Sequence, residues 1–511
     1  MLATPNSPAQ ASPVMAPAVA DTGAGTAESG LHRVLKPRHL SMIAIGGSIG
    51  TGLFLASGAS VASAGPGGAI VAYAVIGFMV FFVMTSLGEM AAYIPVSGSF
   101  STYGSRFVET GFGFALGWNY WYNWAVTIAS ELAASAIIMR FWFPDTPGII
   151  WSALFLVLMF GLNAISAKGF GESEFWFALI KVLAVILFIT VGLIVLAGLL
   201  PGHPSPGVAN LFVGDAPFVG GITALIGVAL IAGFSFQGTE LVGVAAGESE
   251  NPSQSIPKAV KQIFWRILLF YVLSILVIGL LIPYTDPHLL NSDPHDISAS
   301  PFTILFSELG LGTRGSLMNL VVLTAVLSAG SSGMYASTRM LYSMALEGKA
   351  PRLFRKVTSG GIPINALYAT AIIGGLCFLS SVFGERTVYT WLLNTSSMCG
   401  FIAWLGIAIC HYRFRKGLLA QGKSLDVLPY RANWFPFGPL FASALCLAII
   451  LGQNYPALTG ATINWSGLAA TYITIPLFLA IWLGYRARHG TPFVRYEDMD
   501  VSPHPEARHA R

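Results

Sequence analysis

Three ionisable residues, Glu131, Lys181 and Glu240, lie within long apolar runs of the sequence. A charged side chain at the centre of a bilayer costs about 2.5–3.5 kcal/mol on insertion scales, so such residues persist where they face a cavity or a partner. A buried carboxylate can hold a cation or a proton. A buried lysine can release and regain a proton, because desolvation disfavours its charged form. These residue types therefore favour cation binding and proton exchange.

Each of these residues also has a purely structural interpretation. Glu240 could cap backbone donors, Lys181 could form a fixed ion pair or extend to the nearer membrane surface, and Glu131 could make an interhelical hydrogen bond. Two further acidic residues, Glu89 and Glu248, lie near the ends of apolar runs, and Glu89 is expected to be structural and to lie at the membrane interface. The choice between these interpretations depends on the elements that carry the residues.

Glycine and small polar residues interrupt two of the apolar runs. Residues 46–52 read GGSIGTG within the run 40–64, and residues 233–240 read GFSFQGTE within the run 221–246. Unwound backbone is tolerated in a bilayer only where it is buried in protein or lines a cavity. One break alone could reflect close helix packing at small residues. A pair of breaks at corresponding positions of two halves points instead to the binding site of a transporter.

Membrane-spanning helices are the elements that would carry these residues. Hydrophobic residues make up 54% of the 511 residues and charged residues 10%, whereas a soluble chain carries about 25% charged residues. A spanning helix needs about 20 mostly apolar residues. The sequence therefore predicts an all-α polytopic membrane protein with twelve spans, at about 40–64, 68–92, 112–140, 149–166, 174–200, 221–246, 263–284, 315–344, 364–382, 389–412, 436–454 and 467–487.

The two breaks fall in spans 1 and 6 of this series. Because five is an odd number, a second unit of five spans begins from the opposite side of the membrane, which predicts an inverted repeat. We expect a transporter domain over residues 36–490. Its repeats would cover about 38–200 and 215–412, and two extra helices at about 436–487 would lie outside them.

Basic residues predict the orientation. With a cytoplasmic N-terminus, the external loops hold only Arg140, Arg314 and Arg386 of the 27 lysines and arginines. The positive-inside rule then places both termini in the cytoplasm. Residues 1–35, rich in Ala, Pro, Ser, Gly and Thr, are expected to form a disordered cytoplasmic tail, and residues 491–511 a second cytoplasmic tail. The net charge of +4 reflects this topology rather than nucleic-acid binding.

Other classes of chemistry lack their signatures. The four cysteines form no CxxC motif or disulfide framework, and the nine histidines show no HxxxH spacing, so we expect no metal. No nucleophile–base arrangement or phosphate-binding βα unit is present, so we expect neither an enzyme nor a cofactor. A channel remains open as an alternative, although the paired breaks favour alternating access.

Aromatic residues cluster in span 3. Tyr120 and Trp124 are four residues apart, so they share a helix face. Most aromatic residues of this span are expected to anchor the membrane interface, but one or two could stack on a substrate cation. Glu131 follows Trp124 by seven residues and lies on a similar face. This face of span 3 is therefore a candidate part of the site.

At these residues the chain resembles the amino acid permeases of the amino acid–polyamine–organocation (APC) superfamily. The resemblance extends from about Leu31 to Met499. The most specific stretches are 48–54 (SIGTGLF), 88–100 (GEMA to GSF), 235–240 (SFQGTE), 247–259 (GESE to IPKA) and 337–341 (STRML). Within the family, 117–124 (GWNYWYNW) and 283–287 (PYTDP) look most like the bacterial lysine-transporting members.

The resemblance implies a leucine transporter-like fold and secondary active, proton-coupled uptake across the inner membrane. In that fold the unwound part of span 1 binds the substrate carboxylate through backbone amides, in agreement with the partial positive charge of a half-helix N-terminus. These residues are Ser48, Ile49, Gly50, Thr51 and Gly52. The carbonyls for the substrate amino group belong to Phe234, Ser235 and Gln237. Glu240 would face a side-chain ammonium, and Lys181 matches a lysine that some proton-coupled relatives use in place of sodium.

The resemblance implies L-lysine as substrate and the proton as coupling ion. Glu240 is shared with family members for neutral substrates, so the lysine expectation depends on the overall resemblance. Arginine or ornithine and then a neutral amino acid are the alternatives, and a membrane sensor that binds lysine without moving it is a rival of another class. Ser331 departs from the family pattern, which usually has Asn there, and bears on fine specificity. The oligomeric state stays open.

Overall fold

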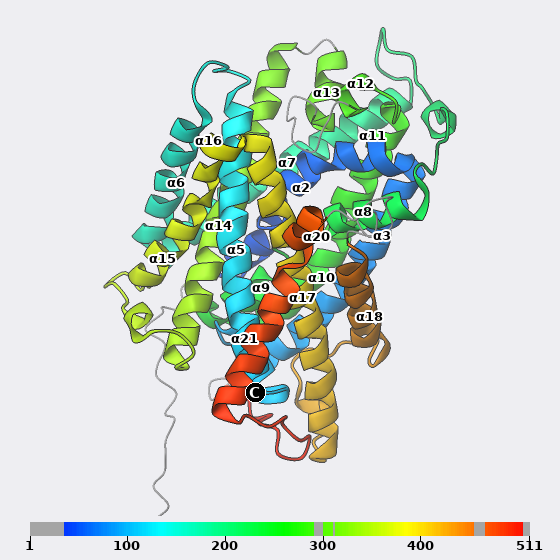
Figure 1. Cartoon of the computed structure of the whole chain (residues 1–511). Helices are drawn as coiled ribbons and strands as arrows, with labels where there is room; N and C mark the ends of the chain where they lie inside the picture. Colours follow the sequence, from blue (N-terminus) through cyan, green and yellow to red (C-terminus); the bar gives the residue numbers. More distant parts are fainter. Residues whose placement is uncertain (1–34, 291–299, 310–311, 454–464, 504–511) are drawn as a thin grey trace, which may run out of the picture.

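The computed structural model describes residues 35–290, 300–309, 312–453 and 465–503. In these residues the fold is all-α, and extended pairing is limited to one isolated bridge between Leu35 and Ser249. Most of the long helices run side by side through the molecule (Figure 1). In chain order the α-helices are α1 (Pro37–Gly46), α2 (Thr51–Phe54), α3 (Ala56–Tyr93), α4 (Ser99–Phe107), α5 (Thr110–Met139), α6 (Gly148–Ile165), α7 (Ala167–Leu196), α8 (Gly221–Phe236), α9 (Leu241–Ala245), α10 (Pro252–Arg266), α11 (Leu273–Leu281), α12 (Pro287–Leu290), α13 (Pro301–Glu308), α14 (Gly312–Leu346), α15 (Ile364–Gly374), α16 (Ser380–Phe383), α17 (Glu385–Ala420), α18 (Phe437–Gly452), α20 (Trp465–Tyr472) and α21 (Thr474–His489).

Seven helical segments of the described residues are long and apolar enough to cross a membrane. The other five expected spans are interrupted, shorter or more polar. For example, the run 263–284 contains a π-helical turn, Ile267–Val272, between α10 and α11, and α18 has 16 residues. The all-α membrane architecture is thus confirmed, whereas the number of twelve spans stays a prediction.

The boundary between the first two expected spans lies inside α3. Gly65 has a φ of 71°, and two helices meet there across a kink. A Cβ at this position would lie 2.6 Å from the carbonyl oxygen of Pro217. The amides of Gly67 and Gly68 donate to the same carbonyl. Glycine is therefore required both by the backbone conformation and by the approaching loop.

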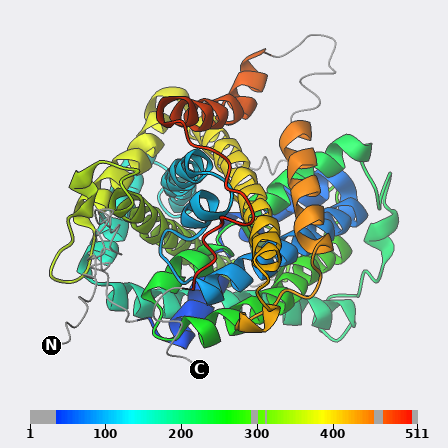
Figure 2. The ribbon, with the colours of Figure 1, turned by 90° about the horizontal axis from the view of Figure 1, so that it is seen from below.

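Helix α5 lies at the centre of the packing, against α14 on one side and α17 on another. Its residues Tyr120, Trp124 and Glu131 are all buried. The end-on view shows α18 and the α20–α21 pair at the periphery of the helix assembly (Figure 2). The proposed repeat boundaries themselves stay a prediction.

The two expected tails differ in what the structure describes. Residues 1–34 and 504–511 lie outside the described residues. The segment 491–503 packs against the helices: the Val494 amide donates to the carbonyl of Val108 over 2.9 Å, and Met499 and Val501 are buried. The described part of the second tail is therefore a packed segment.

Candidate functional site

Both predicted helix breaks are present, and one begins later than expected. The first separates α1, which ends at Gly46, from α2, which begins at Thr51. The second separates α8, which ends at Phe236, from α9, which begins at Leu241. The sequence pattern predicted that this second break would begin at residue 233, and that boundary is wrong.

Gly233 is a packing glycine within α8 rather than a hinge. A Cβ at Gly233 would lie 2.2 Å from the Phe401 ring of α17. The residue allows a close helix contact, which a sequence pattern does not distinguish from unwinding. The break proper consists of residues 237–240.

The backbones of the two breaks are in contact. Gly238 has a φ of +94°, and a Cβ there would lie 2.3 Å from the carbonyl oxygen of Gly47. The Tyr271 hydroxyl lies 2.9 Å from the carbonyl oxygen of Ser48 and 3.0 Å from that of Ser235. The Tyr271 hydroxyl therefore links the first break to the last turn of α8, and the close approach of Gly238 to Gly47 joins the two unwound segments themselves.

A small cavity of about 20 Å³ lies at this junction. A cavity needs about 10–15 Å³ to hold one water molecule, so the structure represents a closed conformation of the site. The residues that line the cavity are Gly47, Ser48, Gly50, Thr51, Gly52, Trp124, Thr127, Glu131, Phe234, Gln237 and Ala329.

Most of the predicted substrate residues line this cavity. They are Ser48, Gly50, Thr51, Gly52, Trp124, Phe234 and Gln237. Ile49, Tyr120, Ser235 and Glu240 are buried beside it but do not line it. Sequence reasoning missed Thr127, which lies three residues after Trp124 and four before Glu131. That spacing places all three on one face of α5 and could have identified Thr127.

Glu131 supplies the carboxylate of the cavity. Its Oε1 accepts a hydrogen bond of 3.1 Å from the Thr51 hydroxyl at the first break. Its Oε2 and the indole nitrogen of Trp124 have no hydrogen-bond partner among the described residues. Buried polar atoms are rarely left without partners. A polar ligand or a water molecule in the cavity would satisfy the free carboxylate oxygen of Glu131.

Glu240 lies behind the cavity, where neutral donors surround it. Its carboxylate accepts from Tyr120 Oη over 3.3 Å, from Trp404 Nε1 over 3.2 Å and from the Gly238 amide over 3.2–3.3 Å. The side chain caps the second break, as the structural interpretation predicts. No ion pair to Glu240 is found within the described part of the chain.

Lys181 is tied to the first break. Its Nζ donates a hydrogen bond of 2.6 Å to the carbonyl oxygen of Gly46, the last residue of α1. The same Nζ lies 3.8 Å from Glu174 Oε1 on its own helix, α7. The Lys181 side chain is fully buried, so extension to the membrane surface is wrong for this conformation.

The two remaining candidates lie outside the cavity. Glu248 Oε1 accepts from Arg339 Nε over 2.8 Å and from the Tyr335 hydroxyl over 2.9 Å. The Ser331 hydroxyl accepts a 3.0 Å hydrogen bond from Asn163 of α6. An amide is therefore present beside Ser331, supplied by the facing helix.

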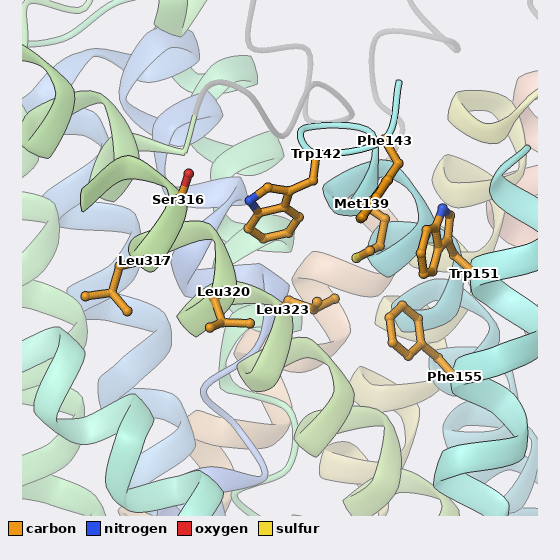
Figure 3. Close-up of a pocket in the computed structure, with 9 residues that line it drawn as sticks. All are labelled: Met139, Trp142, Phe143, Trp151, Phe155, Ser316, Leu317, Leu320 and Leu323. Atoms are coloured by element: carbon orange, nitrogen blue, oxygen red, sulfur yellow. The ribbon is translucent and has the colours of Figure 1, made fainter. Parts of the chain in front are cut away.

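One open pocket of the described residues is unrelated to this site. It is an apolar groove between α5, α6 and α14, where Trp142, Trp151, Phe155 and Leu320 lie on its walls (Figure 3). Apart from the Met139 sulfur, the Ser316 hydroxyl and the indole nitrogens, the side chains that line it are hydrocarbon. Such a surface suits lipid contact rather than recognition of a charged solute. Within the described residues, no cluster of His, Cys, Asp and Glu could hold a metal ion.

The sequence matches known transporters over almost its whole length. The family profile described as amino acid permease matches residues 39–496. The chain is 65% identical to the lysine-specific permease LysP of Escherichia coli (strain K12), an alignment that covers 93% of this chain and 97% of the relative. Two proteins of Lactococcus lactis subsp. cremoris (strain MG1363) are also similar. The lysine-specific permease LysP is 51% identical, covering 94% and 95%, and the histidine permease HisP is 50% identical, covering 92% and 98%.

A solved structure shares the fold. The crystal structure of the Eremococcus coleocola manganese transporter, in complex with an aromatic bis-isothiourea substituted compound, has a TM-score of 0.54. The match covers 88% of this chain and 94% of the other at 14% sequence identity. At this identity the likeness concerns the fold alone, and it agrees with the leucine transporter-like architecture.

Proposed function

The chain belongs to the amino acid permease family, and from this premise we propose that it imports L-lysine across a bacterial inner membrane. The assignment of lysine as the substrate rests on the sequence identity of 65% to the lysine-specific permease of Escherichia coli, over nearly the full length of both chains. The lysine-specific and histidine permeases of Lactococcus lactis are almost equally similar, at 51% and 50% identity, so the assignment of lysine rests on the Escherichia coli relative. Arginine or ornithine and then a neutral amino acid stay the alternatives.

Backbone groups of the two breaks would bind the α-amino acid moiety. The amides of Gly50, Thr51 and Gly52 begin the second half of the first broken helix, where the first amides have no intrahelical partner and the helix dipole favours a carboxylate. The carbonyls of Phe234 and Ser235 belong to the last turn of α8 and suit the α-ammonium group. Closing both breaks around the substrate would couple binding to alternating access.

Two carboxylates are available for the side-chain ammonium of lysine. Glu131 lines the closed cavity. Glu240 lies one layer behind it and is bound by neutral donors alone. A buried carboxylate without a cationic partner is costly when ionised, and a bound ammonium would compensate it. We assign the side-chain ammonium to Glu240, reached once the closed site opens, and assign Glu131 to the wall beside the first break.

Proton coupling would act through Lys181 and Glu240. The hydrogen bond from Lys181 to Gly46 links the protonation of a buried lysine to the end of α1. Loss of that proton would weaken the link and change the balance between outward-open and inward-open forms. The proton is then the coupling ion of a symporter whose termini lie in the cytoplasm, as the distribution of basic residues indicates.

Uptake of labelled lysine into proteoliposomes tests this proposal, with the pH gradient and the voltage set independently. Voltage must be controlled because a lysine cation gains about 2.3 kcal/mol per 100 mV on its own. Accumulation driven by an inward proton gradient at zero voltage, with poor competition from arginine, is the expected result. Accumulation on voltage alone would mean a uniporter or exchanger and remove the coupling role of Lys181 and Glu240. Saturable binding without counterflow would mean a sensor.

A further inference from the structure

Glu174 is a buried acidic residue that the function has not yet used. It lies about two turns into α7 and seven residues before Lys181, so both side chains occupy one face of the helix. Its side chain is 1% exposed, and its Oε1 lies 3.8 Å from Lys181 Nζ. In the sequence Glu174 lies at the edge of an apolar run, so its deep burial cannot be predicted from the sequence pattern.

Two other helices cover Glu174. The Ser328 hydroxyl of α14 lies 2.8 Å and 2.6 Å from its two carboxylate oxygens. On the other side is α1: a Cβ at Gly46 would lie 2.6 Å from Glu174 Oε1 and equally close to Ala178. Glycine at position 46 thus creates the space in which Glu174 meets the end of α1. The same glycine provides the carbonyl that binds Lys181.

Glu174, Lys181 and Glu131 form a row of three buried ionisable groups. Lys181 interacts electrostatically with Glu174, and both Glu174 and Glu131 interact electrostatically with Lys181. The basic residues Arg38 and His39 of α1 instead contact Glu172, two positions earlier on α7. With all three groups ionised the row would carry one uncompensated negative charge, which is unfavourable in a buried site. The row therefore favours holding one additional proton.

Resting on the proton coupling proposed above, we propose that Glu174 carries the coupling proton between Lys181 and the cytoplasm. The Lys181 ammonium transfers one proton to the Glu174 carboxylate, which leaves a neutral amine and a carboxylic acid. The acid then releases the proton to cytoplasmic water and becomes a carboxylate again. Glu174 is placed for this role because it lies nearer than Lys181 to the start of α7, the proposed cytoplasmic end.

The movement of α1 would control the second transfer. Helix α1 lies between the cavity and the proposed cytoplasmic side, so it must move for the substrate to leave in that direction. Its last residue, Gly46, covers Glu174 and binds Lys181 in the closed form. When α1 separates from α7, Lys181 loses an acceptor and Glu174 gains contact with water. Proton release and substrate release then follow from one displacement.

Glu174→Gln tests the proposal by comparing two assays on the same proteoliposomes. Gradient-driven accumulation of labelled lysine needs the proton to leave, whereas counterflow against unlabelled lysine needs only the return of the loaded carrier. We expect Glu174→Gln to lose gradient-driven accumulation by about 100-fold, the size typical of losing one positioned proton-transfer group, and to keep counterflow within about twofold. Glu174→Asp should restore part of the driven uptake because it keeps an acid.

Glu250→Gln is the control, since it removes an exposed carboxylate just before α10, outside the contact between α1 and α7. It should retain both activities. Equal losses of counterflow and driven uptake in Glu174→Gln would reduce Glu174 to a structural role, and wild-type accumulation would remove the role altogether. If the wild-type protein itself does not accumulate lysine on a proton gradient, proton coupling fails first and the role of Glu174 fails with it.

Discussion

Gly238 decides, at the level of a single residue, whether the two helix breaks can meet. Its backbone has a φ of +94°, and a Cβ would lie 2.3 Å from the Gly47 carbonyl oxygen. The clash cannot be relieved by a side-chain movement, because the Gly47 oxygen belongs to the backbone. The position therefore accepts glycine alone, for reasons of conformation and of space.

Gly238→Ala should destabilise the protein and abolish lysine binding. The left-handed conformation alone costs an alanine about 1–2 kcal/mol, and the contact with Gly47 adds to this. Thermal unfolding in detergent and equilibrium binding would measure the two effects. Gly484→Ala is the control, because it lies within α21, where a Cβ meets no atom within 4 Å. It should be neutral or stabilising by about 0.5–1 kcal/mol. Equal behaviour of the two variants would contradict the assigned contact.

Glu131 can be tested by removing its charge while keeping its shape. In Glu131→Gln the amide oxygen can still accept the hydrogen bond from Thr51, so the fold should persist. The substitution removes one of the two carboxylates whose charge stabilises the Lys181 ammonium, and we expect gradient-driven lysine uptake to fall by about 10-fold, equivalent to about 1.4 kcal/mol. Glu250→Gln, an exposed carboxylate at the start of a loop, should leave uptake unchanged. Uptake at the wild-type rate in Glu131→Gln would mean that the Glu131 carboxylate has only a structural role.

At the scale of elements, Glu89 fixes the end of α3 to α17 and to the following loop. Its Oε1 accepts from Arg415 Nε over 2.6 Å, and its Oε2 accepts from the Ala432 amide over 2.7 Å. Arg415 also donates to the Ala432 carbonyl over 3.0 Å. Glu89 is fully buried and Arg415 nearly so. The pair is therefore structural, as expected for Glu89, but it lies inside the protein rather than at its surface.

Glu89→Gln should destabilise the protein, because it leaves the buried Arg415 without its carboxylate. Removing one partner of a buried ion pair costs about 3–5 kcal/mol. The double variant Glu89→Leu with Arg415→Met should recover part of this loss, since it removes the unpaired guanidinium together with its partner, while the buried His411, 3.2 Å from Glu89, still loses its carboxylate. The melting temperature in detergent measures both. A decrease below about 2 °C in Glu89→Gln, equivalent to less than 1 kcal/mol in a domain of moderate size, would contradict this account.

The elements were predictable from the sequence where local composition determines them. Apolar runs located the helices, and the glycines at 46–52 and 238 located the breaks, because both signals are short in range. The sequence did not separate Gly233 from these, since a glycine that admits the Phe401 ring and a glycine that unwinds a helix look alike. Long-range contacts were equally hidden. Glu174 depends on Ser328, a residue 154 positions away, and no local pattern identifies that partner.

At the scale of the whole molecule, the distribution of charge predicts the orientation. Asp145 lies in the exposed turn between α5 and α6, and Lys423 lies in the exposed turn after α17. The positive-inside rule places the first outside and the second in the cytoplasm. The four native cysteines, Cys377, Cys399, Cys410 and Cys446, are all buried. They should therefore remain unlabelled in the folded protein.

A membrane-impermeant maleimide should label Asp145→Cys in intact cells. The same reagent should label Lys423→Cys only after the inner membrane is permeabilised. The unmodified protein provides the background from its buried cysteines. Labelling of Lys423→Cys in intact cells, together with protection of Asp145→Cys, would invert the proposed topology. The proposed direction of proton release through Glu174 would then be inverted too.

The closed cavity of about 20 Å³ has a kinetic consequence. A ligand the size of an amino acid cannot enter this form, so association has to wait for a spontaneous opening. The observed association rate should rise with ligand concentration and then level off at the opening rate, which for such gating motions falls in the microsecond-to-millisecond range. The association rate of a bulky competitor would be limited by the same opening rate. Its potency would depend on how long it holds the open form, because the frequency of successful encounters is set by the protein.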